Sequence, residues 1–186
     1  VGDDDFVGYT AGQFFVQAAQ RSRQDFSLKS VDDRRSLLQI CQLVGGMPLG
    51  LELAAAWVDV LPLSEIAAEI QQCLDFLETE LRDGPPRHRS MRATFDSSWG
   101  KLDEKEQNAF ARLSIFRGGF TREAAQSVTG ATLRQLSRLV SKSFIQFNQQ
   151  QNRYEVHELL HQYGAEWLIR DSELETSLME RHSRYY

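Results

Sequence analysis

The residues TLRQLSRLVSKSFIQFNQQQNRYEV, numbers 132–156, decide the fold. The first half has the apolar spacing of an amphipathic helix. Its predicted inward-facing residues are Leu133, Leu136, Leu139 and Val140. The second half alternates apolar and polar residues in FIQFN and RYEV around the polar turn QQQN, which is typical of a β-hairpin. A helix followed by a two-stranded wing predicts a winged helix-turn-helix.

The segments around this stretch are predicted to be helical. The expected helices cover residues 90–102, 103–116, 121–130 and 157–170. Thr121 is the expected cap of the third, and Gly130 is expected to end it. A last helix over 172–186 is predicted to have no partner in this chain.

The first half of the sequence predicts a bundle of helices over residues 11–22, 30–46, 48–61 and 64–77. Ser30 is an expected N-cap, Pro48 occupies a first helical position, and Ser64 opens the last helix. One inward stripe is predicted to consist of Leu37, Leu38, Cys41 and Val44.

Gly84-Pro85-Pro86 cannot continue a helix and marks the predicted domain boundary. The expected fold is therefore mainly α. It consists of a helical bundle over 1–84, a winged-helix domain over 85–170, and the start of a further helical array over 171–186.

Composition limits the classes of function. The 186 residues are 41% hydrophobic and carry a net charge of −5, which predicts packed domains and does not favour nucleic-acid binding. Cys41 and Cys73 are far apart, so neither a disulfide framework nor a cysteine zinc site is indicated. Cys41 is expected in the core. No run approaches the roughly 18 apolar residues of a membrane helix. The chain starts with Val and ends within the pattern RHSRYY, so we expect a piece of a longer, cytoplasmic protein.

The sequence VHELLHQYG, residues 156–164, contains His-Glu-x-x-His, the spelling of a zinc peptidase. The longer form of that motif needs a third His at position 167, where this chain has Trp167, and the helix is expected to continue past Gly164. Alternatively, His157 lies at a helix start, where free N–H groups favour an anion such as phosphate. A third interpretation is that His157 caps its own helix or packs beside the wing.

Several motifs together resemble one family, the STAND class of signalling ATPases with NB-ARC-like nucleotide switches. VHELLHQYG is similar to its Met-His-Asp motif, with Val156 and Glu158 replacing Met and Asp. GGMPLGLELAAAWV resembles its Gly-x-Pro motif. The segment 87–128 looks like the winged helix of the large bacterial transcriptional regulators of this class, and RHSRYY looks like the entry to their tetratricopeptide-type repeats.

The resemblance implies a nucleotide-gated switch. In it, Met47 and Pro48 on a helical lid would pack against the adenine of ADP or ATP, and His157 would contact the β-phosphate of ADP. Exchange of ADP for ATP would then release the winged helix and expose surfaces for self-assembly. Glu158 keeps the carboxylate of the Asp in the motif, but its side chain is longer by one methylene.

The sequence contains no Gly-x-x-x-x-Gly-Lys-[Ser/Thr] loop. A phosphate-binding loop would therefore come from an upstream P-loop ATPase domain of the same chain, and the repeats from downstream. We expect that this segment alone is not an enzyme and does not bind ADP tightly.

A DNA-binding winged helix is the main alternative. Arg134, Arg138 and Lys142 are spaced four residues apart on the helix that would enter the major groove, and we expect them on its outer face. The acidic net charge and the uncharged wing tip do not favour DNA contact. The resemblance does not favour it either, because in STAND proteins this winged helix works as an intramolecular arm.

Overall fold

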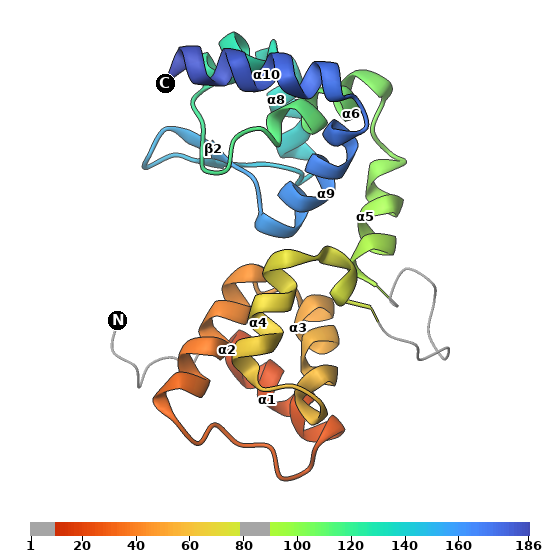
Figure 1. The fold of residues 1–186 in the computed structure, drawn as a ribbon, viewed down its shortest axis with the longest axis vertical. Helices are drawn as coiled ribbons and strands as arrows, with labels where there is room; N and C mark the ends of the chain where they lie inside the picture. The colour runs from red at the N-terminus through yellow and green to blue at the C-terminus, as the bar shows by residue number, and fades with distance from the viewer. Residues whose placement is uncertain (1–9, 79–89) are drawn as a thin grey trace. The chain divides into compact units, whose positions relative to one another are not determined.

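A computed structural model describes residues 10–78 and 90–186 of the chain. The chain divides into two compact units, Val1–Asp96 and Ser97–Tyr186, called here the N-terminal and the C-terminal unit. The predicted boundary between residues 84 and 85 lies outside the described residues. The division instead falls within helix α5, Met91–Trp99 (Figure 1).

The N-terminal unit is a bundle of helices, as predicted. Its elements are α1 (Thr10–Ser22), α2 (Val31–Leu43), α3 (Pro48–Ala55), the 3-10 turn η2 (Ala56–Asp59), α4 (Leu63–Gln72) and the 3-10 turn η3 (Leu74–Phe76). Helix α1 packs against α3, and α2 packs against α4. Its core is mainly aliphatic, and Leu37, Ile40 and Ile66 are completely buried.

Local sequence signals set the ends of these helices. Ser30 caps α2 in a capping box with Asp33, whose backbone N–H lies 3.0 Å from Ser30 Oγ, so the predicted cap is confirmed. Gly45 and Gly46 follow α2 with φ of 58° and 66°, and Pro48 begins α3. The predicted opening of α4 at Ser64 is wrong, because the N-cap is Pro62 and no side chain caps the helix.

The predicted stripe on α2 is partly wrong. Leu37, Cys41 and Val44 are buried, and burial raises the pKa of the Cys41 thiol to about 11. Leu38 is instead 40% exposed. Consecutive residues of a helix point about 100° apart, so Leu38 points away from the face that Leu37 occupies. Ile40 lies on the same face as Leu37 and is buried in place of Leu38.

The C-terminal unit combines helices with one hairpin. After α5 come α6 (Glu104–Leu113), α7 (Arg122–Ala124), the π-helical turn η5 (Ala125–Thr129) and α8 (Leu133–Ser141). Strands β1 (Gln146–Asn148) and β2 (Arg153–Glu155) pair antiparallel, with Phe147 opposite Tyr154. Helices α9 (Glu158–Ile169) and α10 (Ser172–Tyr185) follow. The predicted mainly α fold with a small wing is confirmed.

The turn between η5 and α8 follows the predicted chemistry. Thr121 caps α7 by accepting from the backbone N–H of Ala124 at 3.1 Å, and Gly130 ends η5 with φ of 75°. Thr132 then caps α8 in a capping box with Gln135. The helix, the tight turn and the next helix form the helix-turn-helix to which the hairpin adds a wing.

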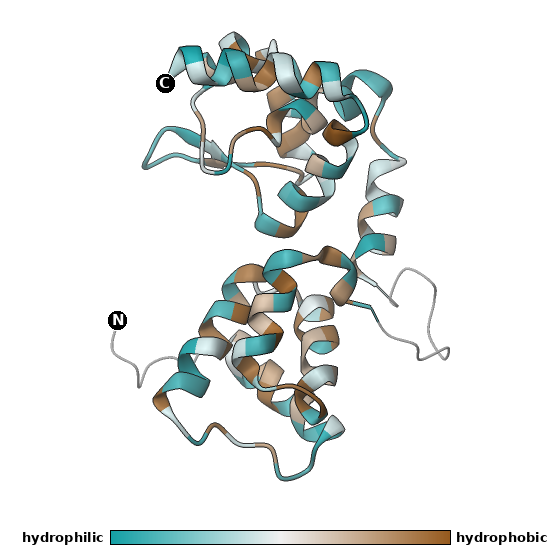
Figure 2. Ribbon diagram, viewed as in Figure 1, coloured by the Kyte–Doolittle hydropathy of each residue, from teal (hydrophilic) through white to brown (hydrophobic). Residues whose placement is uncertain are grey.

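Aromatic rings fill the core of the C-terminal unit. Phe110 lies 5.0 Å from Phe144 and 6.1 Å from Trp99, measured between ring centroids, and Trp167 stacks on Trp99 at 4.9 Å. Helix α9 approaches α6 closely at Gly164, where an added Cβ would lie 2.9 Å from Phe110 Cε1. Packing therefore explains the glycine that extends the zinc-peptidase spelling. Figure 2 shows apolar residues along the helices of both units.

Two predictions about the C-terminal unit are wrong. Leu133 is 50% exposed, whereas Leu136 and Leu139 are buried and Val140 is partly buried. Leu133 is the first residue of α8 and lies at the edge of the buried face. Helix α10 does have partners in this chain, because it packs against η5 and α9 and buries Leu178.

None of the helices within residues 10–78 and 90–186 is both long enough and apolar enough to cross a membrane.

Candidate functional site

Met47 and Pro48 lie where the chain enters α3 in the N-terminal unit. Met47 is half-buried and is the N-cap residue, whereas Pro48 is exposed. The backbone here is fixed by the two left-handed glycines and by the Met47 N–H, which donates to Val44 O at 3.1 Å. Gly50 continues the close packing, since a Cβ there would lie 2.9 Å from Val44 Cβ. The loop thus presents an exposed proline ring on a rigid base.

His157 lies at the start of α9 in the C-terminal unit and is its N-cap. Its Nδ1 accepts a hydrogen bond from the Leu159 N–H at 3.3 Å. Burial lowers the pKa of His157, although Glu158 acts in the opposite direction. The imidazole is therefore neutral at pH 7.

The capping bond also fixes the tautomer of His157. A neutral imidazole that accepts at Nδ1 carries its proton on Nε2. Nε2 is buried and has no hydrogen-bond partner within the described residues. The ring thus combines a structural role at Nδ1 with an N–H donor at Nε2 that has no partner among the described residues.

The His-Glu-x-x-His spelling does not gather a set of metal ligands. Within the described residues no group of three or more His, Cys, Asp or Glu side chains is placed to hold a metal ion. Helix α9 runs past Gly164 to Ile169, as predicted from the sequence. His157 precedes the helix and uses Nδ1 as a cap, so the zinc-peptidase alternative gains no support from this geometry.

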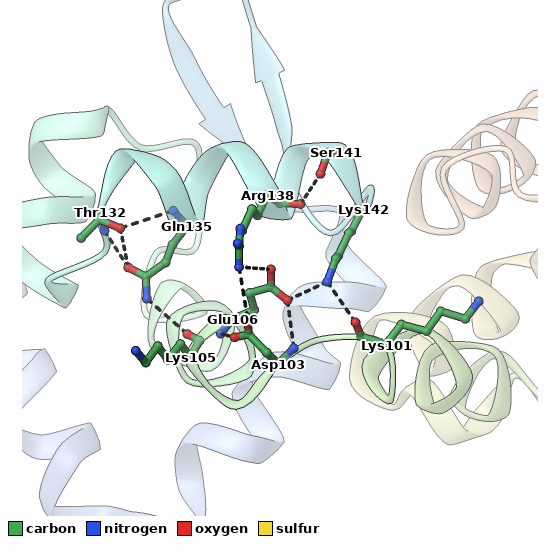
Figure 3. A network of polar contacts seen from close by, with 9 residues as sticks. All are labelled: Lys101, Asp103, Lys105, Glu106, Thr132, Gln135, Arg138, Ser141 and Lys142. Atoms are coloured by element: carbon green, nitrogen blue, oxygen red, sulfur yellow. Dashed lines mark hydrogen bonds and ion pairs between the residues drawn. The ribbon is translucent and has the colours of Figure 1, made fainter.

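The three basic residues Arg134, Arg138 and Lys142 are all exposed, as expected, but they differ in their partners. Arg138 Nη1 lies 3.1 Å from Asp103 Oδ2 and 3.4 Å from Glu106 Oε1, and Figure 3 shows its side chain directed at the start of α6. Lys142 Nζ lies 2.6 Å from Glu106 Oε2 and donates to Lys101 O at 2.9 Å. Two of the three cations predicted for DNA contact are therefore in ion pairs within the unit.

Glu106 is the centre of this network. It is only 2% exposed, and its Oε2 also accepts from the Asp103 N–H at 2.9 Å in the capping box of α6. The hydrogen bond from Lys142, with further help from the Asp103 N–H, holds the pKa of Glu106 below its ordinary value. The carboxylate is therefore ionised at neutral pH and joins α6 to α8.

Arg134 is placed differently from the other two cations. It is exposed on the first turn of α8, and neither a hydrogen bond nor an ion pair is found for it among the described residues. It lines an open hollow of about 640 Å³ between the starts of α6 and α8, together with Asp103 and Glu104. Arg134 is thus the cation of this set that is available to an external anion.

Sequence reasoning missed the role of Glu106. The signal was present in Asp103-Glu-Lys-Glu106, which has the spacing of a capping box. That spacing predicts the bond to Asp103, but the contacts with α8 join residues 32 and 36 positions apart. Only the fold brings these residues together.

Comparison with known proteins places this sequence within longer relatives. No family model matches the chain. A Mycobacterium bovis protein with the provisional name of an HTH-type transcriptional regulator is 31% identical over 185 residues, which is 95% of this chain and 21% of that protein. A Mycobacterium tuberculosis protein with the same type of name matches equally.

A second Mycobacterium bovis protein, whose name states no function, is 30% identical over 177 residues. The match covers 89% of this chain and 44% of that protein. The chain therefore spans less than half the length of the curated relatives it matches.

Proposed function

We propose that this chain is a regulatory segment of a transcriptional regulator. The observation that carries the proposal is the alignment of 95% of the chain with a segment of proteins named as HTH-type transcriptional regulators. A C-terminal unit built as a helix-turn-helix with a hairpin wing agrees with it.

The experiment uses the full-length parent in its own cells and removes residues 97–186 in frame. Transcript levels across the genome are the measurement. We expect a defined set of transcripts to change. An unchanged transcriptome, with the shortened protein still present at normal abundance, would contradict the proposal.

Two modes of action are open to such a segment, and the first is direct DNA contact. The relatives' names favour this mode, since they specify a helix-turn-helix class and mention no nucleotide. Arg134 is exposed at the start of α8, where a recognition helix contacts DNA. Against it, Arg138 and Lys142 pair with Glu106, so contact with phosphates by these two requires that the ion pairs break.

Fluorescence anisotropy with a duplex of random sequence tests this mode. If α8 contacts DNA, affinity falls as salt rises, and Arg134→Ala weakens binding and reduces the salt slope by about one phosphate contact. Arg117→Ala, which removes an exposed arginine from a loop, is the matched control. Binding that is absent at low salt, or equal in both variants, would exclude α8 as the DNA-contacting element.

The second mode is nucleotide gating, as the resemblance to STAND proteins implies. In this mode a nucleotide held by an upstream domain is contacted by His157 at a phosphate and by Met47 and Pro48 at the adenine. The buried Nε2 of His157 supports this proposal, because an N–H donor at a helix start suits a phosphate oxygen. The exposed ring of Pro48 on its rigid loop supplies a flat apolar surface for a base.

The test of nucleotide gating is His157→Ala in the full-length parent, with retention of ADP after gel filtration and basal transcription as the two measurements. We expect faster loss of ADP and higher basal output. His182→Ala, in the same unit but on α10, is the matched control. Equal ADP retention and equal output in the two variants would remove His157 from the proposed switch.

A further inference from the structure

A second hollow in the C-terminal unit lies against the turn of the helix-turn-helix. It measures about 230 Å³ and is lined by residues of α6 and of the turn before α8, namely Lys105, Asn108, Arg112, Thr129, Gly130 and Gln135 among others. A water molecule occupies about 30 Å³ of liquid, so the hollow has room for a small polyatomic ion.

The wall on the side of the turn is already fixed by internal hydrogen bonds. Thr129 is 2% exposed, and its hydroxyl donates to Ala125 O at 2.7 Å and accepts from the Ala131 N–H at 3.3 Å. Gln135 donates to Lys105 O at 3.3 Å and so ties α8 to α6. Because these groups are satisfied, the turn is a rigid support rather than the source of free donors.

The free donors come from α6. Lys105, Asn108 and Arg112 are spaced three and four residues apart, which places them on one face of that helix. Within the part of the chain that the structure describes, no hydrogen bond or ion pair is found for any of these three side chains. Figure 3 shows Lys105 pointing away from the carboxylates of Asp103 and Glu106.

Arg112 has the clearest unmet requirement. Its Nε is buried and has no acceptor among the described residues. A buried N–H of a charged group without an acceptor is unfavourable, and native structures contain few of them. An oxygen-rich anion next to the guanidinium would supply the missing acceptor.

The charge of the lining has the matching sign. Two cations and no carboxylate line this hollow. Three acids, Asp103, Glu104 and Glu106, line the other hollow at the start of α6, which shares Lys105 and Gln135 with this one. Asp103 and Glu106 are paired with cations of α8, which leaves Glu104 as the exposed competitor for Lys105.

We propose that Lys105, Asn108 and Arg112 form a binding site for a phosphate group. The planar guanidinium binds two phosphate oxygens, the ammonium adds a second positive charge, and the amide of Asn108 donates a further hydrogen bond. The group is the same whether it belongs to a nucleic-acid backbone or to a small phosphorylated compound. The site can be measured with inorganic phosphate alone, so its test does not require either mode of action proposed above.

The experiment titrates the 186-residue chain, labelled with ¹⁵N, with inorganic phosphate at constant ionic strength. The backbone N–H signals of Gly130 and Ala131 and the Nε–H signal of Arg112 report on the hollow. We expect saturable shifts of all three in the wild-type chain. Arg112→Gln and Lys105→Gln should each weaken phosphate binding about tenfold, as read from Gly130 and Ala131.

Arg117→Gln, which removes the same charge from an exposed loop, should leave the phosphate titration unchanged. Arg112→Lys keeps the charge but loses the planar pair of donors, so its affinity should fall between those of Arg112→Gln and the wild type. The remaining signals of each spectrum show whether a variant is folded. This control separates a lost site from a lost fold.

A random DNA duplex distinguishes the two sources of the phosphate group. If Arg112→Gln weakens duplex binding and lowers its salt slope while Arg117→Gln does not, the group belongs to nucleic acid. If inorganic phosphate binds and the duplex does not, the site takes a small phosphorylated compound. Either result supports the site. Absence of saturable shifts in the wild type, or equal titrations of wild type and a folded Arg112→Gln chain, would overturn it.

Discussion

The two units are held together in different ways. In the N-terminal unit, aliphatic side chains such as Leu37, Ile40 and Ile66 make most of the core. In the C-terminal unit, rings surround Phe110 and a buried carboxylate, Glu106, joins two helices. Aliphatic packing tolerates changes of shape, whereas stacked rings and charge-assisted hydrogen bonds require defined geometry. The unit with the helix-turn-helix is thus the one in which positions are set most tightly.

The largest effect is expected from the aromatic core. Phe110→Ala should destabilise the C-terminal unit by about 3–5 kcal/mol, and Leu37→Ala should destabilise the N-terminal unit by about 2–5 kcal/mol. Urea titrations followed by NMR signals of each unit separately measure both. If Phe110→Ala lowers the free energy of unfolding by less than Leu37→Ala does, the ring cluster adds nothing beyond an aliphatic core. The proposed difference between the two units would then be wrong.

Removal of the buried carboxylate should have the next largest effect. Glu106→Ala deprives Arg138 and Lys142 of their partner and the α6 capping box of its acceptor. Both cations are partly exposed and can turn to water, so we expect a loss of about 1–3 kcal/mol in the free energy of unfolding. Glu104→Gln, at an exposed position on the same helix, is the control and should change stability by less than about 0.5 kcal/mol.

A smaller effect tests the ends of the helices in the N-terminal unit. Ser30→Ala removes the side-chain cap of α2 and should cost about 0.5–2 kcal/mol. Ser64→Ala lies inside α4, which has no side-chain cap, so its effect should stay within about 0.5 kcal/mol. Thermal unfolding of the two variants gives the answer. Equal losses would mean that the capping box of α2 adds nothing measurable.

The smallest expected effect is on the pH dependence of stability. Burial lowers the pKa of His157 in the folded chain, so the unfolded chain binds more protons as the pH falls below the ordinary histidine value of about 6.5. The stabilising contribution of the neutral ring is present above that pH and is lost towards the lower folded pKa. His157→Asn keeps a capping acceptor and removes the titration. Stability between pH 7.5 and 5.5 should therefore depend less on pH in this variant than in the wild type.

Short-range signals in the sequence were sufficient for most of the secondary structure. The caps at Ser30 and Thr121 and the left-handed Gly130 depend on neighbours within a few residues, and each was predicted. The hairpin followed from alternation around a polar turn. Such features are readable because the chemistry that fixes them is local.

The predictions from the sequence failed where contacts between distant parts of the chain determine burial and pairing. Leu38 and Leu133 are leucines in helical patterns, but each lies at an edge of its buried face, and the pattern alone does not show where that face ends. The pairing of Arg138 and Lys142 with Glu106 depends on the placement of α8 on α6. For His157 the sequence offered three interpretations, and the structure supports the cap through Nδ1.

Gly164 has an effect beyond its own contact. The distance between two packed helices depends on the side chains at their crossing. Here Gly164 of α9, which has no side chain, packs directly against the ring of Phe110. Any larger residue would move the axis of α9 outward. Because His157 and the wing join the beginning of that helix, the direction in which the imidazole N–H faces is controlled two turns away, by a residue without a side chain.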